Sequence, residues 1–179
     1  MSRLPLTAVL TAGLVLASGC SSGDTPPVHT PTPTVAVDVW NPCDGLEAAR
    51  VGRALGVEVR KRTGTPDATR CAFIPVLKGD AAITVTYQLF AGGLDAAWAT
   101  MGHLDGTVSR PRVPGSDDAR LVVNSRRQAV AVTGFVQNGD LIQVVNVVNP
   151  RPYDRDAAVA AGTLVMRDLS AHADDAGVA

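Results

Sequence analysis

The chain has few of the residues from which enzyme active sites are usually built. Its histidines and glutamates are limited to His29, His103, His172, Glu47 and Glu58. The histidines fall in an expected linker, at an expected helix end and in an expected C-terminal tail, which predicts neither a metal triad nor a Ser-His pair. No Gly-x-Ser-x-Gly run follows an expected strand, and Gly92-Gly93 lacks the spacing and the lysine of a phosphate-binding loop. The sequence therefore proposes no catalytic residue, no metal site and no cofactor.

Positive charge in excess is also absent. The formal net charge is −1, and lysine occurs only at Lys61 and Lys78. A protein that binds nucleic acid usually carries a basic patch and a high isoelectric point, so we expect no nucleic acid partner. After residue 20 the chain has no apolar run of the roughly 20 residues that a membrane-spanning helix needs.

What the chain does have is a secretory signal at its start. Arg3 is followed by an apolar run over residues 4–17, and small residues then lead to Gly19-Cys20. This pattern predicts a signal peptide over residues 1–19 that is cleaved before a lipidated Cys20. The lipobox has Ala17 where leucine is commoner, and the alternative is an ordinary secretory signal that contains a cysteine. We expect the mature protein to be held at the extracytoplasmic face of the cell membrane by the lipid on Cys20.

The composition changes twice after the signal. Residues 20–37 are rich in serine, threonine and proline, which predicts a disordered tether. Residues 38–171 have the length and apolar content of a single α+β domain, and residues 172–179 are expected to be a frayed tail.

Two cysteines remain once Cys20 is acylated. Cys43 and Cys71 lie in the expected extracytoplasmic domain, with no histidine near either. In an oxidising compartment such a pair favours a disulfide bond over two free thiols or a metal site.

Hydrophobic periodicity predicts an antiparallel sheet flanked by two or three helices. Asp44 and Glu47 have capping-box spacing, which predicts a helix over residues 45–55. Strict alternation predicts a strand over residues 83–89 with Ile83 and Leu89 on the same face. The remaining expected elements are strands at 57–60, 71–74, 119–124, 128–136 and 141–148, and helices at 94–101 and 155–170.

The strongest local signal is Asn138-Gly139, which favours the turn of a β-hairpin between the last two strands. Apolar residues occupy both faces of residues 141–148, so we expect this strand to lie centrally with cover on both sides. Asp154 is the expected N-cap of the final helix. Trp98 is expected to be a core residue rather than a ligand platform.

The order of these motifs resembles domain-of-unknown-function family 3558. The resemblance covers residues 38–170 and is carried by Asn41-Pro42-Cys43, by Cys71-Ala72-Phe73, by the Asn-Gly hairpin and by the closing alanine-rich helix. It implies an actinobacterial lipoprotein without an established activity. Many members have a second cysteine pair, and the matching regions here, residues 125–128 and 153–156, contain no cysteine. Related lipoproteins imply a Mog1/PsbP-like architecture by analogy only.

Two kinds of charged residue are candidates for function. Arginines could hold anionic envelope groups through bidentate guanidinium contacts, although charge that protects sheet edges and loops is the simpler reading. These candidates are Arg110, Arg112, Arg120, Arg126 and Arg127, together with Arg60-Lys61-Arg62. Asp117-Asp118, which we interpret as a solvated turn, could also serve as paired acids with Asp95 and Asp105 nearby in the sequence.

These features favour a non-enzymatic lipoprotein that binds an unknown envelope ligand or protein. The alternative is a hydrolase or transferase that acts on envelope polymers with aspartates as acid and base.

Overall fold

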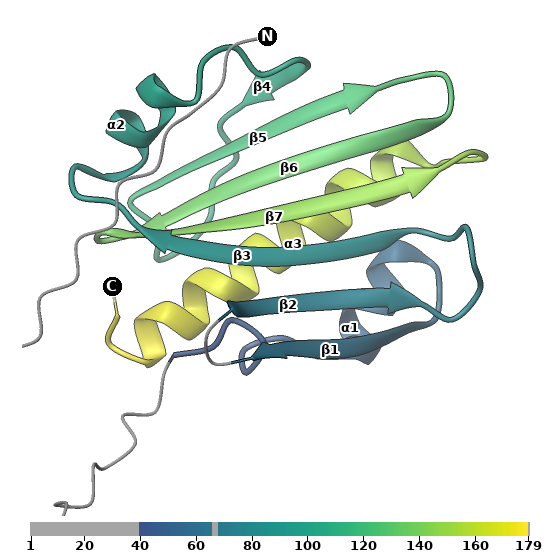
Figure 1. Cartoon of the computed structure of the whole chain (residues 1–179), viewed down its shortest axis with the longest axis horizontal. Helices are drawn as coiled ribbons and strands as arrows, with labels where there is room; N and C mark the ends of the chain where they lie inside the picture. The colour runs from purple at the N-terminus through teal and green to yellow at the C-terminus, as the bar shows by residue number, and fades with distance from the viewer. Residues whose placement is uncertain (1–39, 66–67, 179) are drawn as a thin grey trace, which may run out of the picture. The chain divides into compact units, whose positions relative to one another are not determined.

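Alternating apolar and polar residues over most of the domain produce a single antiparallel sheet. The computed structural model describes residues 40–65 and 68–178, all of which belong to one compact unit, Asp38–Ala179. In chain order the elements are α1 (Ala48–Leu55), β1 (Val59–Thr65), β2 (Ala68–Pro75), β3 (Ala82–Leu89), α2 (Gly93–Thr100), β4 (Thr107–Ser109), β5 (Asp118–Ser125), β6 (Ala129–Asn138), β7 (Leu141–Pro150) and α3 (Arg155–Asp175). The expectation of an α+β fold with an antiparallel sheet and flanking helices is confirmed (Figure 1). The expected signal peptide, Cys20, His29 and the whole of the expected tether lie outside the described residues.

The seven strands are ordered β1-β2-β3-β7-β6-β5-β4, so the last strand of the chain is inserted beside β3. The β6–β7 hairpin turns at Gly139, whose φ of 57° requires a residue without a Cβ penalty. The expected Asn-Gly hairpin and the central position of the last strand are both confirmed.

One face of the sheet carries the main hydrophobic core. The long helix α3 packs on β6 and β7, and α1 packs on α3 and β1. Buried residues such as Phe73, Ile83 and Val145 meet Val165 and Leu169 of α3. Along each strand, residues of this core alternate with residues of the opposite face, because successive side chains of a strand point to opposite faces.

The opposite face is covered only over part of its area. The short helix α2 packs on β6 and β7 there, and its Leu94 and Ala97 form a second buried cluster with Phe135 and Ile142. The expectation of cover on both sides of β7 is therefore correct for Ile142, whereas Val148 of the same strand is 47% exposed.

The first helix begins later than the capping-box pattern predicts. It starts at Ala48, and Glu47 occupies the N-cap position without any side-chain hydrogen bond. The expected pairing of Asp44 with Glu47 is wrong, because residues 41–45 form turns that pack under β1 and α3 instead of the first turn of a helix. Asp154 does cap α3, since its Oδ1 accepts a hydrogen bond from the Ala157 N–H at 2.9 Å.

The expected end of the final helix at residue 170 is also wrong. The helix continues to Asp175, and the side chain of Ala173 is fully buried. Only the last residues of the expected tail lie outside the helix. The sequence did not indicate that the helix continues past residue 170, because a segment with one buried alanine and one histidine has the composition of a polar tail.

Several strand boundaries differ from the expectation. β1 continues past the expected end at residue 60 to Thr65, β2 begins at Ala68 rather than at residue 71, and β4 was not expected at all. Leu89 ends β3 with 75% of its side chain exposed rather than facing the core. None of the described helices is both long enough and apolar enough to span a membrane.

Candidate functional site

The half of the sheet face that no described helix covers is an unpartnered surface of the domain. We call it the open face, and it consists of two rows of residues that run across the strands opposite α3. The first row is Arg60, Ile74, Ala82, Val148, Ala131 and Asn124, and the second is Arg62, Ala72, Thr84, Asn146 and Thr133, ending at Val122, which is buried in the α2 cluster. The second row is polar in its middle, with Thr133 Oγ1 donating to Asn146 Oδ1 at 3.1 Å, whereas Ile74 and Val148 of the first row are exposed apolar residues.

The charge of the open face is positive at the β1 edge. Arg60 and Arg62 end the two rows, and Arg70 of β2 points to the same face because Cys71, the next residue, is buried on the other. Neither row contains a carboxylate. Among the described residues, none of these three guanidinium groups forms an ion pair.

A groove lies between β1 and β2 on this surface. It has a volume of about 370 Å³ and a floor of small residues, with arginines and threonines along its sides. Its lining residues are Arg62, Thr63, Gly64, Thr65, Ala68, Arg70, Ala72 and Ile74. A Cβ at Gly64 would lie 2.2 Å from the Ala68 carbonyl oxygen, so glycine is required for the close approach of the two strands. We call this feature the arginine groove.

A second, smaller hollow lies at the other side of the open face. It has a volume of about 190 Å³ and is lined in part by Leu104, Asp105 and Thr133. Asp105 is not free in this hollow, because its Oδ2 lies 3.2 Å from Arg126 Nη2. The hollow therefore has no uncompensated charge among its lining residues.

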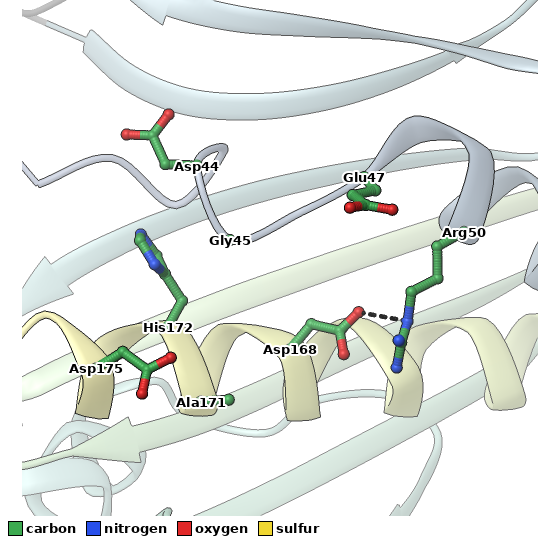
Figure 2. A pocket seen from close by; sticks show the side chains of 8 residues that line it. All are labelled: Asp44, Gly45, Glu47, Arg50, Asp168, Ala171, His172 and Asp175. Atoms are coloured by element: carbon green, nitrogen blue, oxygen red, sulfur yellow. Dashed lines mark ion pairs between the residues drawn. The ribbon is translucent and has the colours of Figure 1, made fainter.

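A polar pocket of about 400 Å³ lies between the start of α1 and the end of α3 (Figure 2). Asp168 Oδ2 lies 3.0 Å from Arg50 Nε, and this ion pair joins the two helices. Burial raises the pKa of the Asp168 carboxyl, Arg50 opposes this shift, and the Glu47 carboxylate adds to it. The pocket also has Asp44 and Asp175 on its walls, so its lining is mainly acidic.

His172 lies in the same pocket wall and has a structural contact on its other side. Its ring stacks on Trp40 with 5.5 Å between centroids, and its Nε2 donates to the Asn41 carbonyl oxygen at 3.2 Å. These contacts attach the last turns of α3 to the segment before Cys43. They explain why the expected tail is folded.

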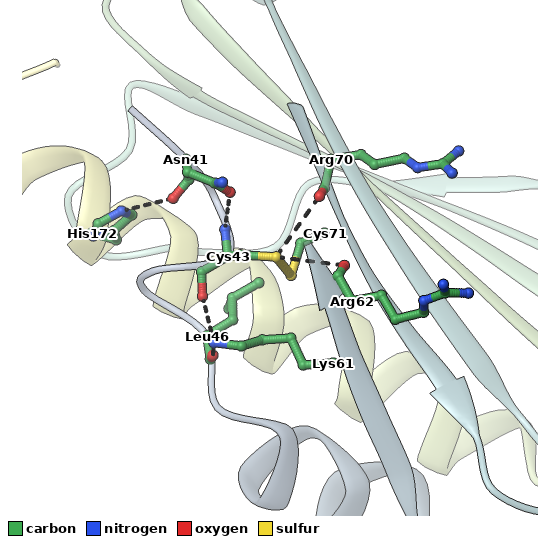
Figure 3. The surroundings of a disulfide bond; sticks show 8 residues. All are labelled: Asn41, Cys43, Leu46, Lys61, Arg62, Arg70, Cys71 and His172. Carbon is green, nitrogen blue, oxygen red and sulfur yellow. Dashed lines mark hydrogen bonds between the residues drawn. A yellow bond between two sulfur atoms is a disulfide. The ribbon is translucent and has the colours of Figure 1, made fainter. Parts of the chain in front are cut away.

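The disulfide bond expected between Cys43 and Cys71 is confirmed (Figure 3). The cystine joins the segment before α1 to β2 across 28 residues of sequence. The loop is further fixed by Lys61, whose Nζ donates to the carbonyl oxygens of Cys43 and Leu46 at 3.0 and 2.9 Å. Lys61 therefore serves the fold on the face opposite to Arg60 and Arg62.

The five arginines considered as a possible anion site are distributed over several elements, and only Arg110 and Arg120 share a partner, Asp95. Arg120 is only 4% exposed; it pairs with Asp95 and Asp118 and lies 4.6 Å from the Trp98 ring centre. Arg110 also lies near Asp95, at 3.7 Å, and Arg126 pairs with Asp105. Arg112 and Arg127 are exposed, in the β4–β5 connection and the β5–β6 turn.

The aspartates considered as acid and base have structural partners. Asp117 Oδ2 accepts from the Gly139 N–H at 2.7 Å, which ties the loop before β5 to the β6–β7 turn. Asp118 and Asp95 share Arg120, whose guanidinium lies between β5 and α2.

The aromatic and histidine candidates are also placed. Trp98 is half-buried against Phe135 with 5.4 Å between ring centres, and His103 is an exposed residue 3.9 Å from Asp105. No cluster of three metal-binding side chains occurs in residues 40–65 and 68–178.

Sequence reasoning missed Arg70 as a member of a basic surface. Its only signal was its position, because it directly precedes a cysteine in a strand where alternate residues are buried. Arg62 was identified, but its proximity to Arg70 depends on the β1–β2 register.

Comparison with known proteins adds no relative. No family model matches the chain, and neither a curated protein nor a solved structure is significantly similar to it. The resemblance to domain-of-unknown-function family 3558 and the Mog1/PsbP analogy stay predictions.

Proposed function

We propose that this protein is a lipoprotein anchored through Cys20 at the extracytoplasmic face of the cell membrane, and that its domain is a non-enzymatic binding module of the cell envelope. The anchor is supported by the signal pattern and by the oxidised cysteine pair, which is typical of proteins outside the cytoplasm. The single observation that carries the binding role is the open face. An antiparallel sheet can leave one face in water, but Ile74 and Val148 are 42% and 47% exposed on this face, and large apolar side chains exposed on one surface favour its use by another molecule.

The arginines of the open face favour a hydrophilic, charged partner. The arginine groove combines Arg62 and Arg70 with small residues and Ile74, and the smaller hollow combines Asn124 and Thr133 with Leu104 and Val122. A more apolar hollow of about 430 Å³ lies at α1, lined in part by Ala48, Gly52 and Val59, and is not part of the open face.

The alternative function, hydrolysis or transfer with aspartates as acid and base, has less support. Asp95 and Asp118 hold the buried Arg120, and Asp117 holds the β6–β7 turn. A general acid needs a carboxyl group that can reach substrate, and these groups are already paired.

Site-specific cross-linking in living cells tests the binding role. A photoreactive residue is introduced at Ala72 or Thr84 on the open face, and at Ala160 or Arg167 on the exposed side of α3 as matched controls. We expect one envelope component, identified by mass spectrometry, to be linked to the open-face positions and not to α3. Equal labelling at both sets of positions, or none at either, would overturn the proposal.

The anchor is tested separately by the mass of the mature protein. We expect an N-terminal Cys20 carrying fatty acyl groups, and a Cys20→Ala variant that is not retained in the membrane fraction. A mature form cleaved elsewhere without acyl mass would overturn this part of the proposal.

A further inference from the structure

The arginine groove has the features of an anion site within the open face. Arg62 and Arg70 are both lining residues, and Arg60 lies two residues before Arg62 on the same face of β1. Residues i and i+2 of a strand are roughly 6.7 Å apart, so Arg60 and Arg62 are neighbours on one face of β1, and Arg70 lies on the same face of the adjacent strand β2. Like charges repel, and a bound anion would remove that repulsion.

We propose that the arginine groove binds the phosphate group of a phosphomonoester, with Arg62 and Arg70 as its two ligating residues and Arg60 as a neighbouring charge. This inference rests on the proposed function, because it names the chemistry of a partner for the open face.

The backbone around the groove is held rigidly. The carbonyl oxygens of Arg62 and Arg70 both lie 3.8 Å from Cys43 Sγ, on the opposite side of the strands from their side chains (Figure 3). The pairing of β1 with β2 brings the two backbones together, and the cystine packs against both of them. Figure 3 shows both side chains extending away from the disulfide.

The protection of a sheet edge does not account for this arrangement. Arg60 and Lys61 belong to the edge strand β1, where positive charge prevents pairing with another chain. Arg70 belongs to β2, an interior strand whose ladder with β3 runs from Cys71 to Phe73, so Arg70 directly precedes the residues that are paired on both sides. Charge on the edge strand is already supplied by Arg60, Lys61 and Arg62, so edge protection does not explain a further arginine on β2 that has no carboxylate partner in the described residues.

Charge and geometry favour phosphate over carboxylate. A phosphomonoester carries roughly −1.5 to −2 charges at pH 7 and has three terminal oxygens, so it can accept two guanidinium forks at once. A carboxylate carries one charge and has two oxygens, which match one fork. The small floor formed by Gly64, Ala68 and Ala72 leaves room for the anion between the two arginines.

The experiment titrates the full mature protein with sn-glycerol 3-phosphate and inorganic phosphate, and with acetate as the carboxylate probe, by isothermal calorimetry. The test variant is Arg62→Gln/Arg70→Gln, and the control is Arg53→Gln/Arg167→Gln, which removes the same charge from exposed helix positions. We expect saturable binding of the phosphate probes, weakened by about tenfold or more in the groove variant and unchanged in the control. All four arginines are exposed, and circular dichroism confirms that each variant is folded.

Three outcomes would overturn the inference: no saturable phosphate binding, equal weakening in both double variants, or acetate binding as tight as phosphate. Equal acetate binding would instead indicate an acidic partner. Vesicles of phosphatidylcholine with and without phosphatidic acid identify the source of the phosphate. Tighter binding to the vesicles with phosphatidic acid than to glycerol phosphate assigns the phosphate to a membrane lipid. Tighter binding to glycerol phosphate assigns it to a soluble or polymer-borne ester.

The two proposals fail in different ways. Open-face cross-links without phosphate binding would leave the binding module in place and remove its assigned ligand. Phosphate binding without an open-face cross-link would leave the anion site in place and remove the envelope partner.

Discussion

Cys43 and Cys71 illustrate what a pair of residues can contribute to this fold. Their bond joins the segment before α1 to β2, and the loop between them spans 28 residues. Both side chains are buried at the end of the main core, where Leu46 and Phe73 also lie. Removing the bond leaves the core contacts but increases the conformational freedom of the unfolded chain.

Replacing both cysteines with alanine is expected to lower the free energy of unfolding by about 3.5 kcal/mol on the chain-entropy model. Urea denaturation of the wild type, with and without reductant, and of the double variant measures this change. A variant with the same midpoint as the oxidised wild type would contradict it. In the wild type, alkylation without reduction should modify neither thiol.

Asp168 makes the stability of the α1–α3 contact depend on pH. Its pKa is raised in the folded protein, chiefly by burial, so the folded state binds a proton more tightly than the unfolded state. Its contribution to stability is therefore greatest below its ordinary pKa and is lost as the pH rises through the raised value. We expect Asp168→Asn to remove this part of the pH dependence.

Thermal unfolding of Asp168→Asn and the wild type between pH 3 and pH 7 tests this expectation. The difference in melting temperature should favour the variant more at pH 7 than at pH 3. Asp175→Asn, an exposed carboxylate in the same pocket, is the control and should show no such trend.

Residue identity alone predicted the cystine but not the role of the arginines. Two cysteines in a domain that the sequence predicts to be extracytoplasmic have few alternatives, whereas each arginine can be a solvated charge, an ion pair or a ligand. Arg120 and Arg62 cannot be distinguished in the sequence. Their difference comes from Asp95 and Asp118, which surround one and are absent from the other.

At the scale of elements, the last turns of α3 act as an anchor for the start of the domain. Ala173 is buried, and His172 contacts both Trp40 and Asn41. The C-terminal end of α3 is therefore attached to the segment that carries Cys43.

Truncation after Ser170 is expected to lower the free energy of unfolding by about 2 kcal/mol, from one aromatic stack, one hydrogen bond and one buried alanine. Truncation after Asp175 is the control, because residues 176–178, which follow the helix, are exposed. Denaturant midpoints of both truncations measure the difference, and equal midpoints would show that the last turns are dispensable.

Element types were predictable, but several boundaries were not. Strict alternation identified β3, and Asn138-Gly139 identified the β6–β7 hairpin, because both signals are local. The capping-box pattern at Asp44 was misleading because the disulfide and Lys61 hold that segment in turns. The three-residue β4 has no periodicity of its own and exists because β5 pairs with it.

At the scale of the whole molecule, the sheet connects two unequal hydrophobic layers. The main core lies under α1 and α3, and the smaller cluster lies under α2. Strands β6 and β7 contribute side chains to both layers, since Val145 faces one and Ile142 faces the other. We therefore expect the two layers to unfold together.

The two tryptophans provide one probe for each layer. Trp40 stacks on His172 at the α3 side, and Trp98 packs on Phe135 at the α2 side. Denaturation followed by fluorescence in Trp40→Phe and Trp98→Phe variants, each normalised to its own circular dichroism transition, should give coincident curves. An earlier transition of Trp98 would show that α2 detaches as a separate unit.

The sequence alone determined the class of the fold and the pairing of the cysteines, because periodicity along a strand and the number of thiols are properties of the covalent chain. The tertiary structure decided which half of the sheet is uncovered, which arginines have carboxylate partners and where the C-terminal turns dock. These features depend on strand order and register, which bring together residues such as Thr84 and Asn146 that are distant in the chain. Local patterns contain no information about such neighbours, since the free energy that selects them comes from burying the core as a whole.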